Sequence, residues 1–240
     1  MSPLRSTLIL PAVVAGSAAF LVVLILGPGL LVAVVAGVIV AAVFSRIVSG
    51  RAVGVVRRSL NARPALVGEF PRLHNTVDGL CLTHGIDPPE LFVIDSTAGN
   101  AAAMAGRDGT SLVLTTGAAD RLGLVELEAL VAHLLVRCGD DALAPDTTTA
   151  SMGRLAGPRL VGAADAGPDR MMRVDFDGAD LTRFPPGMQT ALQALADLGT
   201  EVDAPRATSR LWLLQPDGRT DVATTSHPTV EVRVAALGEC

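Results

Sequence analysis

The chain has 240 residues, of which 50% are hydrophobic, and its formal net charge is −5 at pH 7 with a pI near 5.3. This acidic balance and the 3% content of aromatic residues exclude nucleic acid as the main partner, because such binding needs a basic face and rings for base stacking. The length allows one soluble domain with appendages. The three cysteines have no zinc-binding spacing and indicate reduced thiols in a cytosolic compartment: Cys81, Cys138 and Cys240.

Two uncharged apolar runs near the N-terminus predict a transmembrane hairpin within residues 1–50. The first run, residues 8–26, would form a helix of about 28 Å, close to the thickness of a bilayer core. The sequence "GPG" interrupts it at residues 27–29, and a second span covers about residues 30–48 if Arg46 reaches the interface. A signal peptide, a single long span and a re-entrant hairpin are the alternatives. A signal peptide fits poorly, because signal peptides have a shorter apolar region and are not followed at once by a second apolar run, as residues 8–26 are here.

The arginines predict how this hairpin is oriented in a cell membrane. One arginine, Arg5, precedes the first span, and none lies in the turn. Several follow within fifteen residues of the second span: Arg46, Arg51, Arg57, Arg58 and Arg63. Because positive residues stay on the cytoplasmic side, we expect both termini and a soluble domain, residues 51–240, in the cytoplasm.

The first half of that domain is predicted to be a helix followed by a small antiparallel sheet. Apolar residues recur at three- and four-residue spacing over residues 64–84, and Gly85 with two prolines ends this helix. Three short β-prone segments then follow, separated by turn residues: "ELFVIDS" at 90–96, "NAAAMAG" at 100–106 and "SLVLTTG" at 111–117.

The second half is predicted to be mostly helical. An amphipathic helix covers about residues 124–137, and His133 and Arg137 share one of its faces. Residues 139–168 indicate a mobile connection with a short helix around 151–159. Further helices are expected from Pro168, over 188–198 and from Pro228, whereas "SRLWLLQ" fits strand and helix equally well.

Several of these segments, in this order, resemble the HtpX-like membrane zinc metallopeptidases, which are relatives of the CAAX prenyl protease. The resemblance is carried by "HGIDPPELFVIDSTAGNAAAMAG", "SLVLTTGAADRLGLVELEALVAH", "DLTRFPPGMQTAL" and "SHPTVEVRVAAL". It implies a mostly α-helical, zincin-like domain with a small antiparallel β-sheet behind the N-terminal hairpin. A membrane protein that matches this family by chance is the alternative.

In that family a helix carries H-E-x-x-H, in which two histidines bind zinc and the glutamate polarises water. A third ligand is the glutamate of a later E-x-x-x-D helix, whose aspartate orients the first histidine. Here the motif reads His133-Leu134-Leu135-Val136-Arg137. The resemblance therefore places the first histidine on His133, the base on Leu134 and the remaining positions on Arg137, Met171 and Asp175.

These replacements predict that the chain has neither a catalytic residue nor a resident metal. Leu134 cannot accept a proton, and Arg137 cannot bind a metal because its guanidinium stays protonated. Met171 is a thioether, which suits softer metals than zinc. A lone His133 does not hold zinc, since a catalytic site needs three protein ligands. The alternative is an active metalloendopeptidase that binds zinc through other, distant residues.

His133 and Asp175 match the family's residues, so we expect part of the original site to remain as a structural feature formed by His133, Asp175 and Arg137. We expect His133 and Asp175 to stay hydrogen-bonded and Arg137 to turn towards Asp175 or Asp141, because a buried cation needs an anion. The resemblance also makes residues 100–102 (Asn100, Ala101 and Ala102) a candidate substrate groove. The predicted role is non-catalytic binding or regulation, for example in membrane-protein quality control. The partners would be the lipid bilayer and a peptide segment, another protein or an active family member.

Overall fold

The computed structural model describes residues 3–27, 29–107, 109–153, 168–224 and 226–239. The helices in these ranges are α1 (Pro3–Ile25), α2 (Leu30–Ser59), α3 (Pro71–His84), α4 (Thr116–Arg121), α5 (Leu124–Cys138), α6 (Leu143–Met152), α8 (Pro168–Thr182), α9 (Pro185–Asp197), the 3-10 helix η2 (Arg206–Leu211) and α10 (Val230–Leu237). The strands are β1 (Arg63–Pro64), β2 (Glu90–Ile94), β3 (Ala101–Gly106) and β4 (Gly109–Thr115). The chain is therefore mostly helical with one small sheet, as the sequence predicts.

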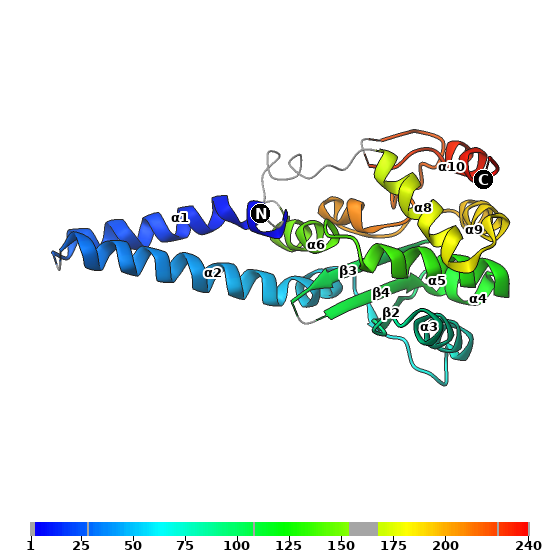
Figure 1. Cartoon of the computed structure of the whole chain (residues 1–240), viewed down its shortest axis with the longest axis horizontal. Coiled ribbons are helices and arrows are strands. Elements are labelled where there is room, and N and C mark those ends of the chain that lie inside the picture. Colours follow the sequence, from blue (N-terminus) through cyan, green and yellow to red (C-terminus); the bar gives the residue numbers. More distant parts are fainter. Residues whose placement is uncertain (1–2, 28, 108, 154–167, 225, 240) are drawn as a thin grey trace.

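The first two helices lie antiparallel, and together they project from the rest of the molecule (Figure 1). They approach closely where two glycines face each other. A Cβ at Gly16 would lie 2.7 Å from the carbonyl oxygen of Gly37, and a Cβ at Gly37 would lie 2.9 Å from the carbonyl oxygen of Gly16. Small residues at such a crossing let helix backbones pack without side chains between them. Helix α2 continues to Ser59, so the boundary expected at residue 50 lies inside a continuous helix.

Within the described ranges, α2 is the helix that is both long and apolar enough to cross a membrane. Its most apolar 18-residue window has a mean hydropathy of 2.6, and 11% of that window is buried. Residues Pro11–Ile25 of α1 form a shorter apolar stretch. Exposed apolar side chains are what a helix needs when its surroundings are lipid.

The sheet differs from the antiparallel sheet of three strands that the sequence predicts. It has four strands in the order β1-β2-β4-β3, with β2 and β4 parallel and the outer pairs antiparallel. The β3–β4 hairpin is present as predicted. After β2, however, the chain crosses to the sheet edge to form β3, so β4 returns between β2 and β3 and runs parallel to β2. The sheet is mixed for this reason.

Helix α5 lies at the centre of the soluble part. It contacts strands β3 and β4 on one side and helices α8 and α9 on the other (Figure 1). Its residues 129–135 are all buried, so this helix lacks the solvated face of an ordinary amphipathic helix. The histidine that the sequence singles out therefore sits in the core of the domain.

Two later segments correct or complete the sequence-based predictions. Residues 139–168 were expected to be a mobile connection, but α6 occupies Leu143–Met152 within them. The short helix expected around 151–159 falls largely outside the described residues. The ambiguous segment "SRLWLLQ" contains the end of η2 and then an extended residue, Trp212, which forms an antiparallel bridge with Ala102 of β3.

Candidate functional site

The site lies where α5 and α8 cross, and a glycine makes this crossing close. A Cβ on Gly178 of α8 would lie 2.9 Å from the Cα of His133 on α5. Asp175 and Met171 lie three and seven residues before Gly178, so they occupy the same face of α8 as helical spacing requires. The helices thus bring together His133 and Asp175, which lie 42 residues apart in the sequence, and Met171 is buried on the same face of α8.

His133 is completely buried beside Asp175. Its Nδ1 lies 3.0 Å from Asp175 Oδ1, which is the contact that the resemblance predicts. The separation fits a hydrogen bond, but the oxygen lies off the direction that a well-aligned bond requires. Burial is the main reason why the pKa of His133 is lowered, and the nearby Arg233 and Arg137 lower it further against the attraction of Asp175. The ring is therefore neutral at pH 7, and its buried Nε2 has no hydrogen-bond partner among the described residues.

Asp175 is held by an arginine from the last helix. Arg233 of α10 donates from Nε and Nη2 to the two carboxylate oxygens of Asp175, each at 2.7 Å, in a bidentate pair. A third donor, Nη1, reaches the carbonyl of Leu213 at 2.8 Å. Burial disfavours the carboxylate, but Arg233 and His133 outweigh it and hold the pKa of Asp175 below its usual range. The charge of Asp175 is thus neutralised within the core.

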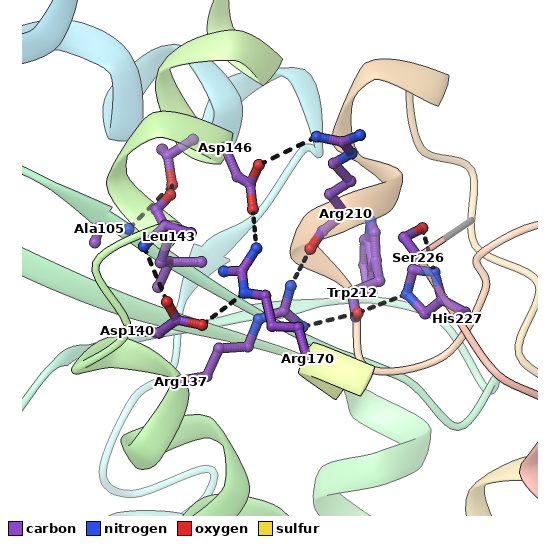
Figure 2. A network of polar contacts seen from close by, with 12 residues as sticks. Ala105, Arg137, Asp140, Leu143, Asp146, Arg170, Arg210, Trp212, Ser226 and His227 are labelled. Atoms are coloured by element: carbon purple, nitrogen blue, oxygen red, sulfur yellow. Dashed lines mark hydrogen bonds and ion pairs between the residues drawn. The ribbon is translucent and has the colours of Figure 1, made fainter. Parts of the chain in front are cut away.

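Arg137, at the second-histidine position, is also buried, with 3% of its surface exposed. Its guanidinium donates to the carbonyl of Trp212 at 2.9 Å and to the carbonyl of Arg210 (Figure 2). The prediction that Arg137 turns to Asp175 or Asp141 is therefore wrong. Burial lowers the pKa of Arg137 to about 10, a shift that the positive Arg170 reinforces, so the side chain is still charged at neutral pH. Oriented carbonyl dipoles take the place of the expected carboxylate.

The carboxylates near Arg137 are bound by a different arginine. Arg170 of α8 donates from Nε to Asp140 Oδ2 at 2.6 Å and from Nη1 to Asp146 Oδ2 at 2.8 Å (Figure 2). The other oxygen of Asp146 lies 3.7 Å from Nη1 of Arg210. A network of alternating charges therefore surrounds Arg137, which explains how this cation is tolerated without a direct ion pair.

His227 also belongs to this network, because it contacts the Trp212 carbonyl to which Arg137 donates. Its Nε2 lies 3.0 Å from the Trp212 carbonyl that also accepts from Arg137, and its Nδ1 lies 2.9 Å from the hydroxyl of Ser226 (Figure 2). Because a carbonyl can only accept, Nε2 carries the proton and Nδ1 accepts from Ser226. Burial lowers the pKa of His227 to about 4, although the bond to Trp212 opposes this. His227 is therefore a neutral structural donor here.

These side chains do not fit a zinc ion. Zinc in a catalytic site takes three nitrogen, oxygen or thiolate ligands from the protein. At this site His133 Nε2 is a suitable atom, but Leu134 is a hydrocarbon, Met171 is a thioether and Arg137 is a fixed cation bound to carbonyls. Among the described residues no group of three or more His, Cys, Asp or Glu side chains is placed to hold a metal.

The candidate groove residues are all buried. Asn100, Ala101 and Ala102 are each 0% exposed. The Asn100 amide donates to the carbonyls of Thr200 and Leu214, while its oxygen accepts from the N–H groups of Ala101 and Leu214. The chain's own segment of residues 212–214 runs along this edge: Trp212 bridges Ala102, and the N–H of Leu213 donates to Ala101 at 2.8 Å. In this conformation no peptide could add to β3 there.

Comparison with known proteins places the chain among peptidase relatives. Proteins named Protease HtpX homolog align with it from Dictyoglomus thermophilum (27% identity, 70% of this chain and 69% of the relative), Acidiphilium cryptum (28%, 73% and 76%) and Ligilactobacillus salivarius (22%, 87% and 85%). The chain is thus similar to HtpX homologs over most of its length. No protein-family model matches it, and no solved structure matches it.

Three residues of this HtpX-like site escape the sequence reasoning. Arg233 is the partner of Asp175, and Arg170 is the partner of Asp140 and Asp146. Trp212 supplies the carbonyl that both Arg137 and His227 contact. A signal existed for Arg233, which is the single charged residue among the six that follow Glu231 in "VEVRVAAL". A carbonyl carries no sequence signal, because every residue has one.

Proposed function

We propose that this HtpX-like protein is a membrane-anchored pseudopeptidase, with a non-catalytic role in binding or regulation. The observation that carries the proposal is the buried guanidinium of Arg137, which stands at the second zinc-ligand position and is bound to two carbonyls. A fixed positive charge beside His133 repels a divalent cation, and the arginine offers no lone pair to bind it.

The reaction chemistry supports the same conclusion. Peptide hydrolysis by this family's mechanism needs a general base to polarise the attacking water. Leu134 stands at that position, is 0% exposed and carries no proton acceptor. The substrate-pairing edge of β3 is covered by residues 212–214 as well. The base and two of the three metal-ligand positions are thus replaced, and the peptide site is occupied.

Anchoring in a membrane follows from α2 and α1. Large apolar side chains along both helices are exposed, among them Val14 at 63%, Leu21 at 53% and Val38 at 64%. Water would disfavour such a surface by roughly 25 cal/mol per Å² of apolar area, whereas lipid tails accept it. We propose that both helices cross the membrane as a hairpin, with the soluble domain in the cytoplasm.

The proposed role is to hold a protein or peptide segment, or to pair with an active family member, in membrane-protein quality control. It rests on the similarity to HtpX homologs together with the loss of the metal site, since function cannot be carried over from fold alone. The second candidate is a metalloendopeptidase with a non-standard zinc site. The unpartnered Nε2 of buried His133 favours it, because this atom is free to ligate.

Zinc analysis of the purified full chain separates the two candidates. We expect less than about 0.1 zinc per chain after dialysis against trace zinc, because one histidine is a weak site. About one tightly bound zinc per chain, lost in a His133→Ala variant, would contradict the pseudopeptidase. If the chain is free of zinc, mass spectrometry of the purified sample would identify a protein segment that co-purifies with it.

Restoration tests whether the ancestral geometry survives. The triple change Leu134→Glu, Arg137→His and Met171→Glu returns the family's ligand set and base. We expect the variant to bind close to one zinc per chain. The matched control restores Leu134→Glu alone, which supplies a base without ligands and should leave the zinc content unchanged.

A further inference from the structure

A basic pocket lies where the last turns of α2 meet the ends of β3 and β4. Its volume is about 330 Å³. The charged residues that line it are Arg51, Arg57, Arg58, Arg107 and Glu90. Among the described residues, four arginines and one glutamate therefore line a space large enough for a phosphate group with its substituents.

The single carboxylate does not neutralise the pocket. Glu90 lies 3.4 Å from Nη1 of Arg57, and the Arg57 guanidinium also stacks over the ring of Phe92 at 4.3 Å. Arg58 donates from Nε to the carbonyl of Gly54, so its two terminal nitrogens stay available. A guanidinium binds a phosphate through two parallel hydrogen bonds, which makes arginine well suited to this ligand.

Glycines keep the pocket open on the side of α2. A Cβ added at Gly50 or at Gly54 would meet no atom within 4 Å. The absence of side chains at these two helical positions leaves the wall of the pocket free for a ligand. It also means that a larger residue could fill the pocket without a clash in the protein.

The pocket lies at the depth of lipid headgroups if α2 crosses the membrane. The apolar part of α2, about residues 30–48, spans about 28 Å of hydrocarbon. Arg51 lies three residues further, which is about 4.5 Å along the helix axis and within the headgroup layer. Arg58 lies about 15 Å beyond residue 48, so the pocket extends from the headgroups towards the soluble domain.

We propose that this pocket binds the phosphate group of an anionic phospholipid on the side of the membrane that bears the soluble domain. The proposal rests on the membrane crossing of α2 given above, and it is independent of whether the chain binds zinc. Arg51 and Arg107 would hold the phosphate near the pocket mouth, and Arg58 would extend the basic wall inward.

The test is native mass spectrometry of the full chain in detergent, with phosphatidylglycerol, phosphatidylcholine or inorganic phosphate added. We expect retention of phosphatidylglycerol at a concentration at least tenfold lower than phosphatidylcholine. The double change Arg51→Gln and Arg107→Gln should weaken that retention on the order of 30-fold, because each such arginine contributes about fivefold. Gly54→Leu, which keeps all four arginines but fills the pocket, should weaken it too.

Controls separate the outcomes. Arg121→Gln, in α4 at the far end of the soluble part (Figure 1), removes one positive charge outside the pocket and should leave retention unchanged. Equal retention of both lipids, or no effect of Gly54→Leu, would contradict the proposal that this pocket binds an anionic phospholipid. Competition by inorganic phosphate at the lipid's own concentration would assign the site to free phosphate instead. Extraction of the chain from membranes by alkaline carbonate would contradict the proposed membrane anchor. If the chain resists this extraction but shows no lipid preference, only the proposed lipid site is refuted.

Discussion

At the residue scale, the Asp175–Arg233 pair is a buried, bidentate ion pair within the core. Both side chains are almost fully buried, and Arg233 contributes two of the bonds that orient the carboxylate. We expect Arg233→Met to lower the free energy of unfolding by about 3–5 kcal/mol, because Asp175 would remain as a buried, poorly compensated charge. Urea unfolding in detergent, followed by the fluorescence of the single tryptophan, Trp212, measures this loss.

A second variant separates the lost ion pair from lost packing. Adding Asp175→Leu to Arg233→Met removes the stranded charge and should recover most of the loss. Arg219→Met is the matched control, since Arg219 faces Asp217 at 3.6 Å on the surface, where an ion pair contributes about 0–1 kcal/mol. Equal losses in the buried and the exposed variant would contradict the importance of the buried pair.

The buried histidines predict that stability falls in mild acid. The pKa of His227 is about 4 in the folded chain and about 6.5 in the unfolded chain. Between these values the unfolded chain binds more protons, so lowering the pH favours unfolding. This difference costs about 2 kcal/mol at pH 5 relative to neutral pH. His133 acts in the same direction, because burial lowers its pKa as well.

Unfolding measured at pH 7.5 and pH 5 tests this dependence. In His227→Gln the loss should shrink by about 2 kcal/mol but not vanish, because His133 still titrates. The lowered pKa of Asp175 does not interfere: its contribution is present above the unfolded value of about 3.9 and is lost only below it. A pH dependence that is identical in His227→Gln and the parent chain would show that this prediction is wrong.

The sequence predicts some of these contacts better than others. The proximity of His133 to Asp175 follows from the resemblance, and the 3.0 Å separation agrees with it. The partner of Arg137 could not be predicted, because it consists of backbone carbonyls 73 and 75 residues away. Electrostatics requires that a buried cation be compensated, but oriented dipoles achieve this as well as a carboxylate does.

At the element scale, the crossing of α5 and α8 depends on the absence of a side chain at Gly178. A methyl group there would approach the Cα of His133 to 2.9 Å, and neither backbone can move without disturbing the core. We expect Gly178→Ala to destabilise the chain by about 1–3 kcal/mol through overpacking, despite the better helix propensity of alanine. Urea unfolding measures the change.

Gly79→Ala is the control for that helix propensity. Gly79 lies inside α3 on the exposed side, and its added Cβ meets nothing within 4 Å. This variant should gain about 0.5–1 kcal/mol. If Gly178→Ala were also stabilising, the close crossing of α5 and α8 would be incorrect.

Helices with periodic apolar residues are easier to predict from the sequence than strand pairing or helices rich in polar residues. Periodic apolar residues predict α5 and α9 nearly at their observed bounds, because burial of these residues stabilises both helices. Helix α6 was missed because its sequence, "LAPDTTTASM", has weak helix propensity. Two of its threonines bond back to carbonyls four residues earlier, Thr147 to Leu143 and Thr148 to Ala144. The parallel pairing of β2 with β4 depends on strand order, which local sequence does not specify.

At the scale of the whole molecule, the hairpin and the arginines that follow it determine how the chain sits in a membrane. The facing ends of α1 and α2 lie at the tip furthest from the soluble part (Figure 1), and the arginines of α2 all lie in its C-terminal half, between Arg46 and Arg58. A membrane that covers the apolar halves of both helices leaves the tip on one side and the soluble part on the other. Because arginines stay inside, the tip is expected outside.

Cysteine labelling in intact bacterial cells tests this topology. In a chain whose native cysteines are replaced by alanine, we expect an impermeant maleimide to label Leu26→Cys, whose parent residue is 77% exposed near the tip. Leu82→Cys, on the 85% exposed Leu82 of α3, and Ser2→Cys should react only after the membrane is opened. Labelling of Ser2→Cys from outside would mean that α2 crosses alone, since α1 would then not return the chain. Labelling of Leu82→Cys but not Leu26→Cys would reverse the orientation, and the basic pocket would then face the outer leaflet.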